Sequence, residues 1–246
     1  MSRNLDQVID DLSYGPLANL AIGSSGGGTI PFTQQNRIVH LINSCLSTLH
    51  SRFLLYQKEL YIRYIDGRSL YPLTETHSDA YAATNPATAG ESFIIDSPAA
   101  PFTDDFIQLL EAWGPPNSLD PDGDLIELGI NDLEADRSVF LPAPDILQIP
   151  DGTAGEVYQF MYQADHYKLV PGLGSQIVNL PEYLFGALEA WVAYKVYSSM
   201  NGEEHRARAM ELFQTYELVC REGVTLGFLK NTPTNTNTKL EERGFV

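Results

Sequence analysis

One short stretch of the sequence has the pattern of a catalytic serine. Gly23-Ser24-Ser25-Gly26-Gly27 matches G-x-S-x-G, the motif in which a serine nucleophile lies on a sharp turn between a strand and a helix. Here the pattern follows a helix-like segment and runs on into Gly28, and no alternation of strands and helices surrounds it. We therefore expect residues 23–28 to be a connecting loop and Ser25 to be non-catalytic.

An acidic turn is the second candidate. Asp120, Asp122 and Asp124 alternate around Gly123, and closely spaced carboxylates are ligands that Ca²⁺ prefers. An EF-hand loop, however, needs glycine at its sixth position and glutamate at its twelfth, whereas here the glycine comes fourth and Asn131 twelfth. The sequence favours a solvated acidic turn, and a looser cation site at residues 120–124 stays open.

The other chemistry-bearing residue types form no motif. No pair of histidines has zinc-ligand spacing, and no glycine-rich loop carries the lysine of a phosphate site. Cys45 and Cys220 fall in stretches of helical periodicity, where small core residues are more common than a disulfide framework. We therefore predict no catalytic residue, no cofactor, no metal and no enzymatic activity. The histidines are His40, His50, His77, His166 and His205.

The charge balance restricts the partners. The 246 residues are 43% hydrophobic, enough for a real core, but 15 Lys and Arg against 32 Asp and Glu give a net charge of −17. An acidic surface repels phosphate, so a groove that grips DNA is not expected, whereas an acidic wall that DNA slides past is compatible. The sequence shows no signal peptide and no apolar run of membrane length, which predicts a protein made and used in the cytoplasm.

The positioning elements begin with two helices. Leu5, Val8, Ile9 and Leu12 recur at helical spacing. A second helix is expected from a cap at Thr33 to near Phe53. Its apolar positions are Ile38, Leu41, Ile42, Cys45 and Leu49.

The middle of the chain is expected to be rich in strands. Residues 54–65 alternate, Asp66-Gly67 is a hairpin turn, and 69–73 is the return strand. One helix is expected at 103–113, with Thr103 as cap and Asp104 and Asp105 in its first turn. Further short strands are predicted at 93–95, 124–128, 139–141, 146–149 and 157–162.

Helices return towards the C-terminus. Pro181 begins one, Asn201-Gly202 ends it, and a second runs from Glu203 to about Glu222 as the other arm of a helical hairpin. Met210, Phe213, Tyr216 and Cys220 are expected on its apolar face. Residues 231–246 begin with a tract that has no apolar side chain, which predicts an extended arm.

The expected fold class is α+β. We divide the chain into an N-terminal helical part (1–54), a β-rich insertion (55–180), a C-terminal helical hairpin that packs with the N-terminal part (181–230), and the arm (231–246). The two helical parts are expected to share one core, with the following members: Val8, Ile38, Leu41, Cys45, Leu188, Trp191, Phe213 and Tyr216.

Several segments become distinctive when they are taken together and in order. They read IDDLSYGPLANL at 9–20, INSCLSTLHSRF at 42–53 leading into KEL at 58–60, LPEYL at 180–184 with Ala187 and Leu188, VYSSMNGEE at 196–204, and ERGFV at 242–246. Between them, RSVF at 137–140 and LQIP at 147–150 match in kind. With these segments the chain resembles the head-to-tail adaptors of podoviruses, particularly those of N4-like phages.

The resemblance implies a virion structural protein. It implies a helical bundle formed by both ends of the chain, a β-rich insertion, and a dodecameric ring under the portal that joins it to a tail or nozzle protein, with duplex DNA as a passing occupant of the channel. It places the protein in the virion neck, assembled in the host cytoplasm, and away from membranes. The arm would bind the portal through Leu240, Glu241, Glu242, Arg243, Gly244, Phe245 and Val246.

Two other function classes stay open. One is a hydrolase that uses the serine loop at 23–28 or the Asp120 cluster, and the other is a host-directed binding module.

Overall fold

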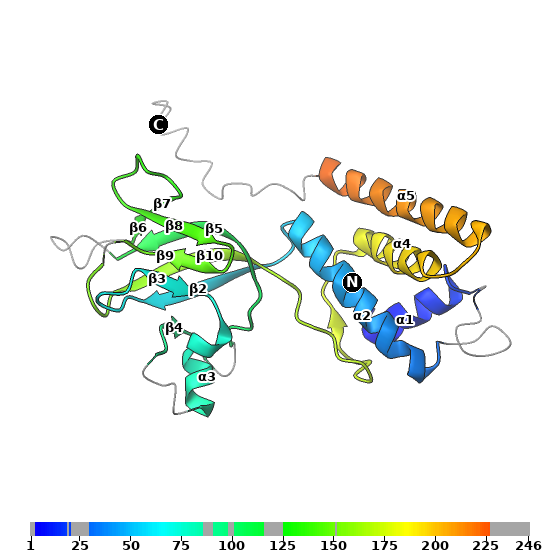
Figure 1. The fold of residues 1–246 in the computed structure, drawn as a ribbon, viewed down its shortest axis with the longest axis horizontal. Coiled ribbons are helices and arrows are strands. Elements are labelled where there is room, and N and C mark those ends of the chain that lie inside the picture. The colour runs from blue at the N-terminus through cyan, green and yellow to red at the C-terminus, as the bar shows by residue number, and fades with distance from the viewer. Residues whose placement is uncertain are drawn as a thin grey trace, which may run out of the picture. The chain divides into compact units, whose positions relative to one another are not determined.

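The computed structural model describes residues 3–18, 20, 30–85, 91–97, 101–115, 125–150 and 152–226. It is a mixed α+β chain, as the sequence predicts. Packing divides it into two compact units. Residues 1–45, 52–54 and 171–246 form the first, which we call the helical unit, and residues 46–51 and 55–170 form the second, the β unit. Figure 1 shows the helices and strands that make up each.

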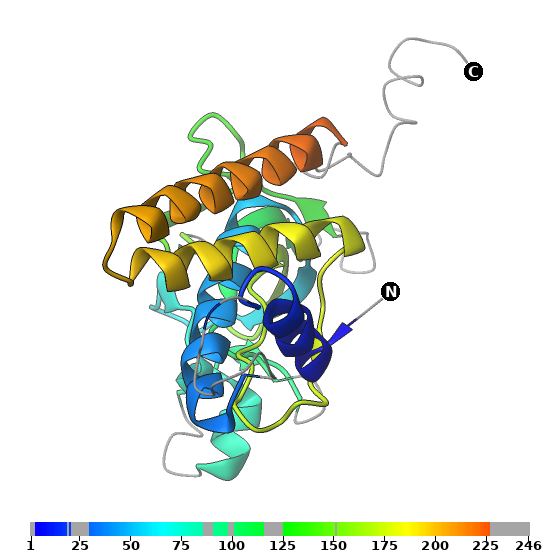
Figure 2. The ribbon, with the colours of Figure 1, turned by 90° about the vertical axis from the view of Figure 1, so that its right-hand side faces the viewer.

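The described residues of the helical unit form α1 (Leu5–Tyr14), most of α2 (Phe32–Arg52), α4 (Glu182–Ser198) and α5 (Glu203–Thr225). Two short strands, β1 (Arg3–Asn4) and β11 (Ile177–Val178), pair antiparallel beside them. The helices α4 and α5 run antiparallel and side by side (Figure 2), joined by a turn in which Gly202 has a φ of 124°, a backbone conformation that favours glycine.

Local signals explain why α1 forms where it does. Val8, Ile9 and Leu12 are buried at helical spacing. Asn4 caps the helix, because its side chain accepts from the Gln7 backbone at 2.8 Å while the Gln7 side chain accepts from the Asn4 backbone at 2.9 Å.

The expected cap of α2 is wrong. The helix begins at Phe32, so Thr33 already lies inside it. The backbone N–H groups of Gln34 and Gln35 donate to the Pro31 carbonyl. The residue that precedes the helix is therefore Pro31 and not Thr33. Its end at Arg52 agrees with the prediction.

Six of the eight residues expected in the shared helical core are buried. Val8, Ile38, Cys45, Leu188, Trp191 and Tyr216 are buried, whereas Leu41 is only partly buried. On the predicted apolar face of α5, Tyr216 and Cys220 are buried as expected, but Phe213 is 41% exposed and Met210 is 66% exposed, so these two assignments are wrong. In the N-terminal half of the helix the buried residues are Ala209 and Leu212, each one position before the expected one, and Gly223 completes the buried face.

The described strands of the β unit form two sheets. The five-stranded sheet has the order β4-β2-β10-β5-β6, and the four-stranded sheet has the order β3-β9-β8-β7. The short helices η1 (Glu75–His77) and α3 (Asp79–Thr84) also belong to this unit. The strands are β2 (Gln57–Arg63), β3 (Leu70–Pro72), β4 (Ile94–Ile95), β5 (Phe106–Gly114), β6 (Ile126–Glu127), β7 (Gly129–Ile130), β8 (Ser138–Ala143), β9 (Ile146–Gln148) and β10 (Val157–Ala164).

Aromatic side chains dominate the core of the β unit. Tyr71, Phe93, Tyr158, Phe160 and Tyr162 are almost completely buried in one cluster. The strands expected at 93–95, 139–141, 146–149 and 157–162 are present as β4, β8, β9 and β10, and β6 falls inside the expected 124–128.

The helix expected at 103–113 is wrong, because this segment is strand β5. Asp104 has a φ of 54°, which no helical first turn allows. The pairing with β10 shifts between Leu109 and Glu111, so that Leu110 is an extra residue in β5. This bulge buries Leu109 and Ala112, three residues apart, which imitates helical spacing in the sequence.

The hairpin expected around Asp66-Gly67 is also wrong. The turn is present, and Gly67 has a φ of 73°. The strand after it, β3, nevertheless pairs with β9 in the four-stranded sheet, while β2 pairs with β10 and β4. The turn therefore carries the chain from one sheet to the other.

Candidate functional site

The site residues predicted from the sequence lie outside the described residues. This applies to the serine loop at 23–28 with Ser25, to Asp120, Asp122 and Asp124, and to the predicted portal-binding residues Leu240, Glu241, Glu242, Arg243, Gly244, Phe245 and Val246. In the described part of the chain, no three His, Cys, Asp or Glu side chains come together in a way that could hold a metal ion.

The two cysteines are buried in the helical unit as free thiols. Burial is the main cause that raises the pKa of Cys45 well above its ordinary value, and it also raises that of Cys220. Both stay protonated and poorly nucleophilic at neutral pH, because the thiolate is the reactive form. They are core residues, as their position in the sequence indicates.

Two histidines meet in the β unit. The rings of His50 and His166 are buried and lie edge to face at 5.5 Å, and Ser47 donates to the Asp165 carboxylate at 2.6 Å nearby. Burial lowers the pKa of His166, which keeps this imidazole neutral. The arrangement supports packing at the end of β10.

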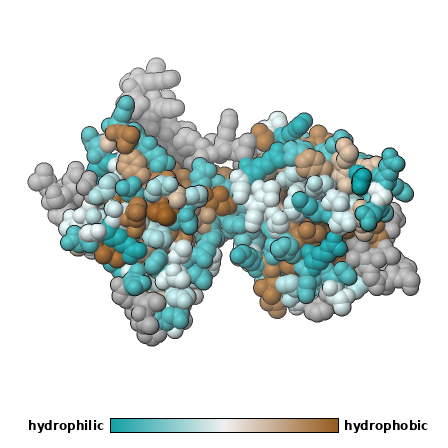
Figure 3. Space-filling view, in the orientation of Figure 1, coloured by the Kyte–Doolittle hydropathy of each residue, from teal (hydrophilic) through white to brown (hydrophobic). Residues whose placement is uncertain are grey.

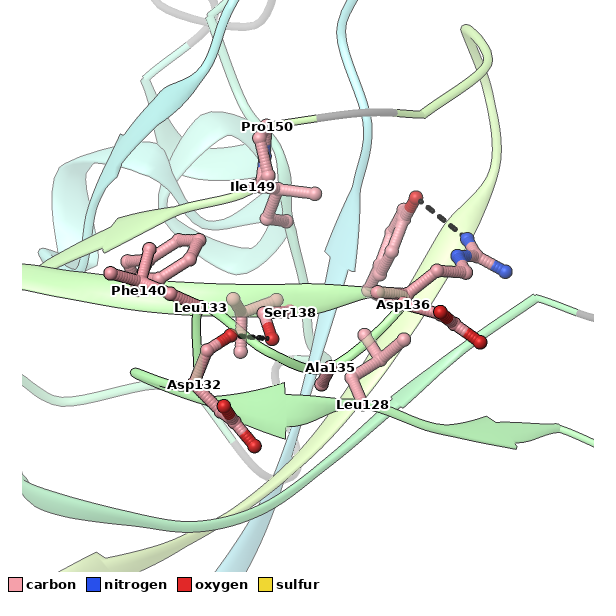
Figure 4. Close-up of a pocket in the computed structure, with 12 residues that line it drawn as sticks. Leu128, Asp132, Leu133, Ala135, Asp136, Ser138, Phe140, Ile149 and Pro150 are labelled. Atoms are coloured by element: carbon pink, nitrogen blue, oxygen red, sulfur yellow. Dashed lines mark hydrogen bonds between the residues drawn. The ribbon is translucent and has the colours of Figure 1, made fainter.

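A small pocket of about 180 Å³ lies beside β8 in the β unit (Figure 4). Arg137 lines it and donates to the Pro115 carbonyl at 3.2 Å and to the Tyr158 hydroxyl at 3.5 Å. The Ser138 hydroxyl donates to the backbone carbonyl of Asp132 rather than to a base. Among the described residues, this serine therefore has no basic partner of the kind that nucleophilic catalysis requires.

A larger groove of about 660 Å³ lies on the same unit, and its volume is typical of ligand-binding clefts. Four segments line it: β2 with Tyr56 before it, β4 with the residues after it, the segment before β5, and the end of β10 with Tyr167 beyond. Its aromatic side chains are Tyr56, Tyr61, Phe102, Tyr162 and Tyr167. Tyr56 is 39% and Tyr167 is 48% exposed, so both offer ring surface to an occupant.

A buried carboxylate orders the inner side of this groove. Asp105 accepts from the Tyr162 hydroxyl at 2.8 Å and forms an ion pair with the Lys58 ammonium. Burial and the Asp105 carboxylate together raise the pKa of Tyr162 above its ordinary value, so its hydroxyl stays protonated and donates. The Lys58 ammonium also lies 5.4 Å from the Tyr56 ring. These groups satisfy one another, which suits binding better than proton transfer.

The sequence analysis missed the groove because it assigned Asp105 to a helix. The alternation at 56–64 did predict that Tyr56, Lys58 and Leu60 share one face of a strand. The residues that complete the groove come from segments more than thirty positions away, and only the fold brings them together.

Charge is unevenly divided between the parts of the chain. Residues 55–170 contain five Lys and Arg against twenty Asp and Glu, a net charge of −15, whereas all other residues contain ten against twelve, a net charge of −2. The acidic character therefore belongs to the β unit. In the space-filling view, hydrophilic residues cover much of the visible face, with apolar patches between them (Figure 3).

Ion pairs in the helical unit link the two ends of the chain. Arg3 pairs with Asp11 of α1 at 2.8 Å and with Glu189 of α4 at 3.2 Å, and its guanidinium lies 4.5 Å from the Phe185 ring centre. Arg52 of α2 forms a bidentate ion pair with Glu217 of α5, in which its two terminal nitrogens donate to the two carboxylate oxygens at 3.0 and 3.2 Å. The Arg3–Glu189 and Arg52–Glu217 pairs join residues that are more than 160 positions apart in the sequence.

The sequence matches no model of a known protein family and no curated protein. Among the described residues, no helix combines the length and the apolar character needed to cross a membrane.

Proposed function

We propose that this chain is a virion structural protein, the head-to-tail adaptor of a short-tailed phage. It forms a dodecameric ring under the portal, joins the portal to a tail or nozzle protein, and lines part of the DNA channel. It is not an enzyme and uses no cofactor. The protein acts in the neck of the virion after assembly in the host cytoplasm.

One observation carries the proposal. Most of the segments that resemble podovirus adaptors come from opposite ends of the sequence, yet their described parts at 9–18, 42–45, 52–53, 180–188 and 196–204 belong to the same helical unit. A resemblance that rests on order and combination gains weight when its parts pack together. The Arg3 and Arg52 ion pairs stabilise that packing.

The finer fold is part of the proposal. The helical unit is the bundle that both ends of the chain build, the β unit is the insertion, and residues 231–246 form the arm that reaches the portal. Leu240, Phe245 and Val246 would enter pockets on the portal, and Glu241, Glu242 and Arg243 would pair with charges beside those pockets.

Two surface features support the ring and its channel. The net charge of −15 in residues 55–170 provides a wall that repels passing DNA. The α5 helix exposes Met210, Leu218 and Val224, and Leu226 follows it. Exposed apolar side chains along one helix suit contact with other copies of the chain.

The deciding experiment compares three forms of the full chain for binding to purified portal rings, read by negative-stain microscopy. The wild type and Ser25→Ala are expected to form the same portal-bound ring. A chain that ends at residue 230 is expected to lose attachment, because weak arms act together in a ring. Normal attachment without residues 231–246 would contradict the portal-binding arm, and failure of the wild type to bind any portal would contradict the adaptor function.

A further inference from the structure

The large groove lies beside an incompletely paired sheet edge. On one side, β2 pairs with β10 along its whole length, from Gln57 opposite Gln163 to Arg63 opposite Val157. On its other side, β4 pairs only with Tyr61 and Ile62. Among the described residues, the part of β2 from Gln57 to Leu60 therefore has a strand neighbour on one side alone.

The hydrogen bonds show which backbone groups face the open side. The Arg63 N–H donates to the Phe93 carbonyl on the β4 side at 2.8 Å, and the Tyr64 N–H donates to the Glu156 carbonyl on the β10 side at 2.8 Å. Successive residues of a strand direct their backbone groups to opposite sides, and the β2–β10 register has no shift. Glu59 and Gln57 therefore direct their N–H and C=O groups to the open side.

The side chains around this edge suit an extended peptide. Tyr56 and Tyr167 expose ring surface, and Ile95, Pro101 and Phe102 add apolar lining. A strand that pairs with Gln57 and Glu59 would gain backbone hydrogen bonds, while its alternate side chains would contact these residues.

The charge of the surroundings selects the peptide. Glu59 and Asp96 line the groove, and its lysine, Lys58, is already paired with Asp105. With a net charge of −15 in residues 55–170, the β unit attracts a basic segment. The end of this chain itself fits less well, because Glu241 and Glu242 offset its basic residues.

We propose that this groove binds an extended, basic peptide segment of another protein, which pairs with β2 beside Gln57–Leu60 and continues the five-stranded sheet. This binding does not depend on the adaptor function.

The first test measures binding of a capped Lys-Val-Lys-Val-Lys-Val-Lys peptide to the full chain by fluorescence anisotropy at low salt. The wild type is expected to bind it, and to bind a version with alternate N-methylated backbone amides at least about tenfold more weakly, because that version lacks the strand donors. Equal binding of the two peptides would show that charge alone holds them and would overturn the proposal. Absence of binding, or tighter binding of a peptide of residues 231–246, would also overturn it.

A pair of variants tests the edge itself. Glu59→Ala and Glu59→Pro both remove the carboxylate, but only proline removes the N–H, and it costs no ladder bond because that N–H faces the open side. We expect Glu59→Pro to melt at the same temperature as Glu59→Ala and to bind the peptide about tenfold more weakly. Equal binding by the two folded variants would contradict pairing at this edge.

Hydrogen exchange of the wild type gives a readout that needs no variant. The amides of Gln57 and Glu59 are expected to exchange quickly in the free protein and slowly with the peptide, whereas those of Lys58 and Leu60 stay slow in both. Slow exchange at Gln57 and Glu59 in the free protein would show that the edge already has a partner and would overturn the proposal.

Discussion

Truncating Trp191 tests the core of the helical unit most directly. Its side chain is 7% exposed in the middle of α4, with Leu188 and Val192 buried beside it in the sequence. Trp191→Ala removes an indole from a packed core that cannot close around the space, which costs about 3–5 kcal/mol of unfolding free energy. Domains of this kind have a stability of about 5–15 kcal/mol, so the loss is a large fraction of the total.

The assay follows urea unfolding by circular dichroism at 222 nm, where helices dominate the signal. With a denaturant dependence of about 1–3 kcal/mol per molar urea, the midpoint should fall by about 1–5 M. Met210→Ala is the matched control, because Met210 on α5 is 66% exposed and its loss should change stability by less than about 0.5 kcal/mol. A midpoint for Trp191→Ala as close to the wild type as that of the control would refute the proposed core.

Three further predictions concern the β unit and its charge. Burial lowers the pKa of His166 in the folded protein. The neutral imidazole therefore contributes its full stabilisation above the pKa of the unfolded chain, about 6.5, and this stabilisation is lost as the pH falls below that value. Urea unfolding should give a lower free energy of unfolding at pH 5.5 than at pH 7.5, and His166→Gln should make this difference smaller. Asp105→Ala leaves the Tyr162 hydroxyl and the Lys58 ammonium without their acceptor and should cost about 2–3 kcal/mol in urea unfolding, while Asp105→Asn costs less. Association of the chain, followed by light scattering, should strengthen between low and moderate salt, because salt screens repulsion between acidic β units; weaker association would contradict this.

Local patterns in the sequence were sufficient for most of the elements. The spacing of Val8, Ile9 and Leu12 gives α1, and the alternation around Leu60 and Ile62 gives β2, because each element buries one face. The wrong predictions for β5 and α5 have physical causes. In β5 a bulge places Leu109 and Ala112 on one face at helical spacing, and on α5 large apolar side chains such as Phe213 stay partly exposed while small Ala209 is buried.

The groove could not be predicted from local patterns. Among the described residues, this edge has no strand partner because β4 is only two residues long and β3, which follows β2 in the chain, pairs in the other sheet. Both facts concern pairing between distant segments, which no turn signal specifies. Asp66-Gly67 predicts a turn correctly, but the turn does not determine the partner of the strand that follows.

The separation of charge limits how copies of this chain can meet. Charges interact over about 8 Å at physiological ionic strength, so two β units that each carry a net −15 repel when their surfaces approach. The rest of the chain carries only −2, and its helix α5 exposes apolar side chains that gain from burial. In the proposed ring, the contacts between copies therefore belong to the helical units, and the β units face DNA, solvent or a basic partner. Under this proposal, the helical units hold the copies of the ring together, and the acidic β units repel the DNA that passes through it.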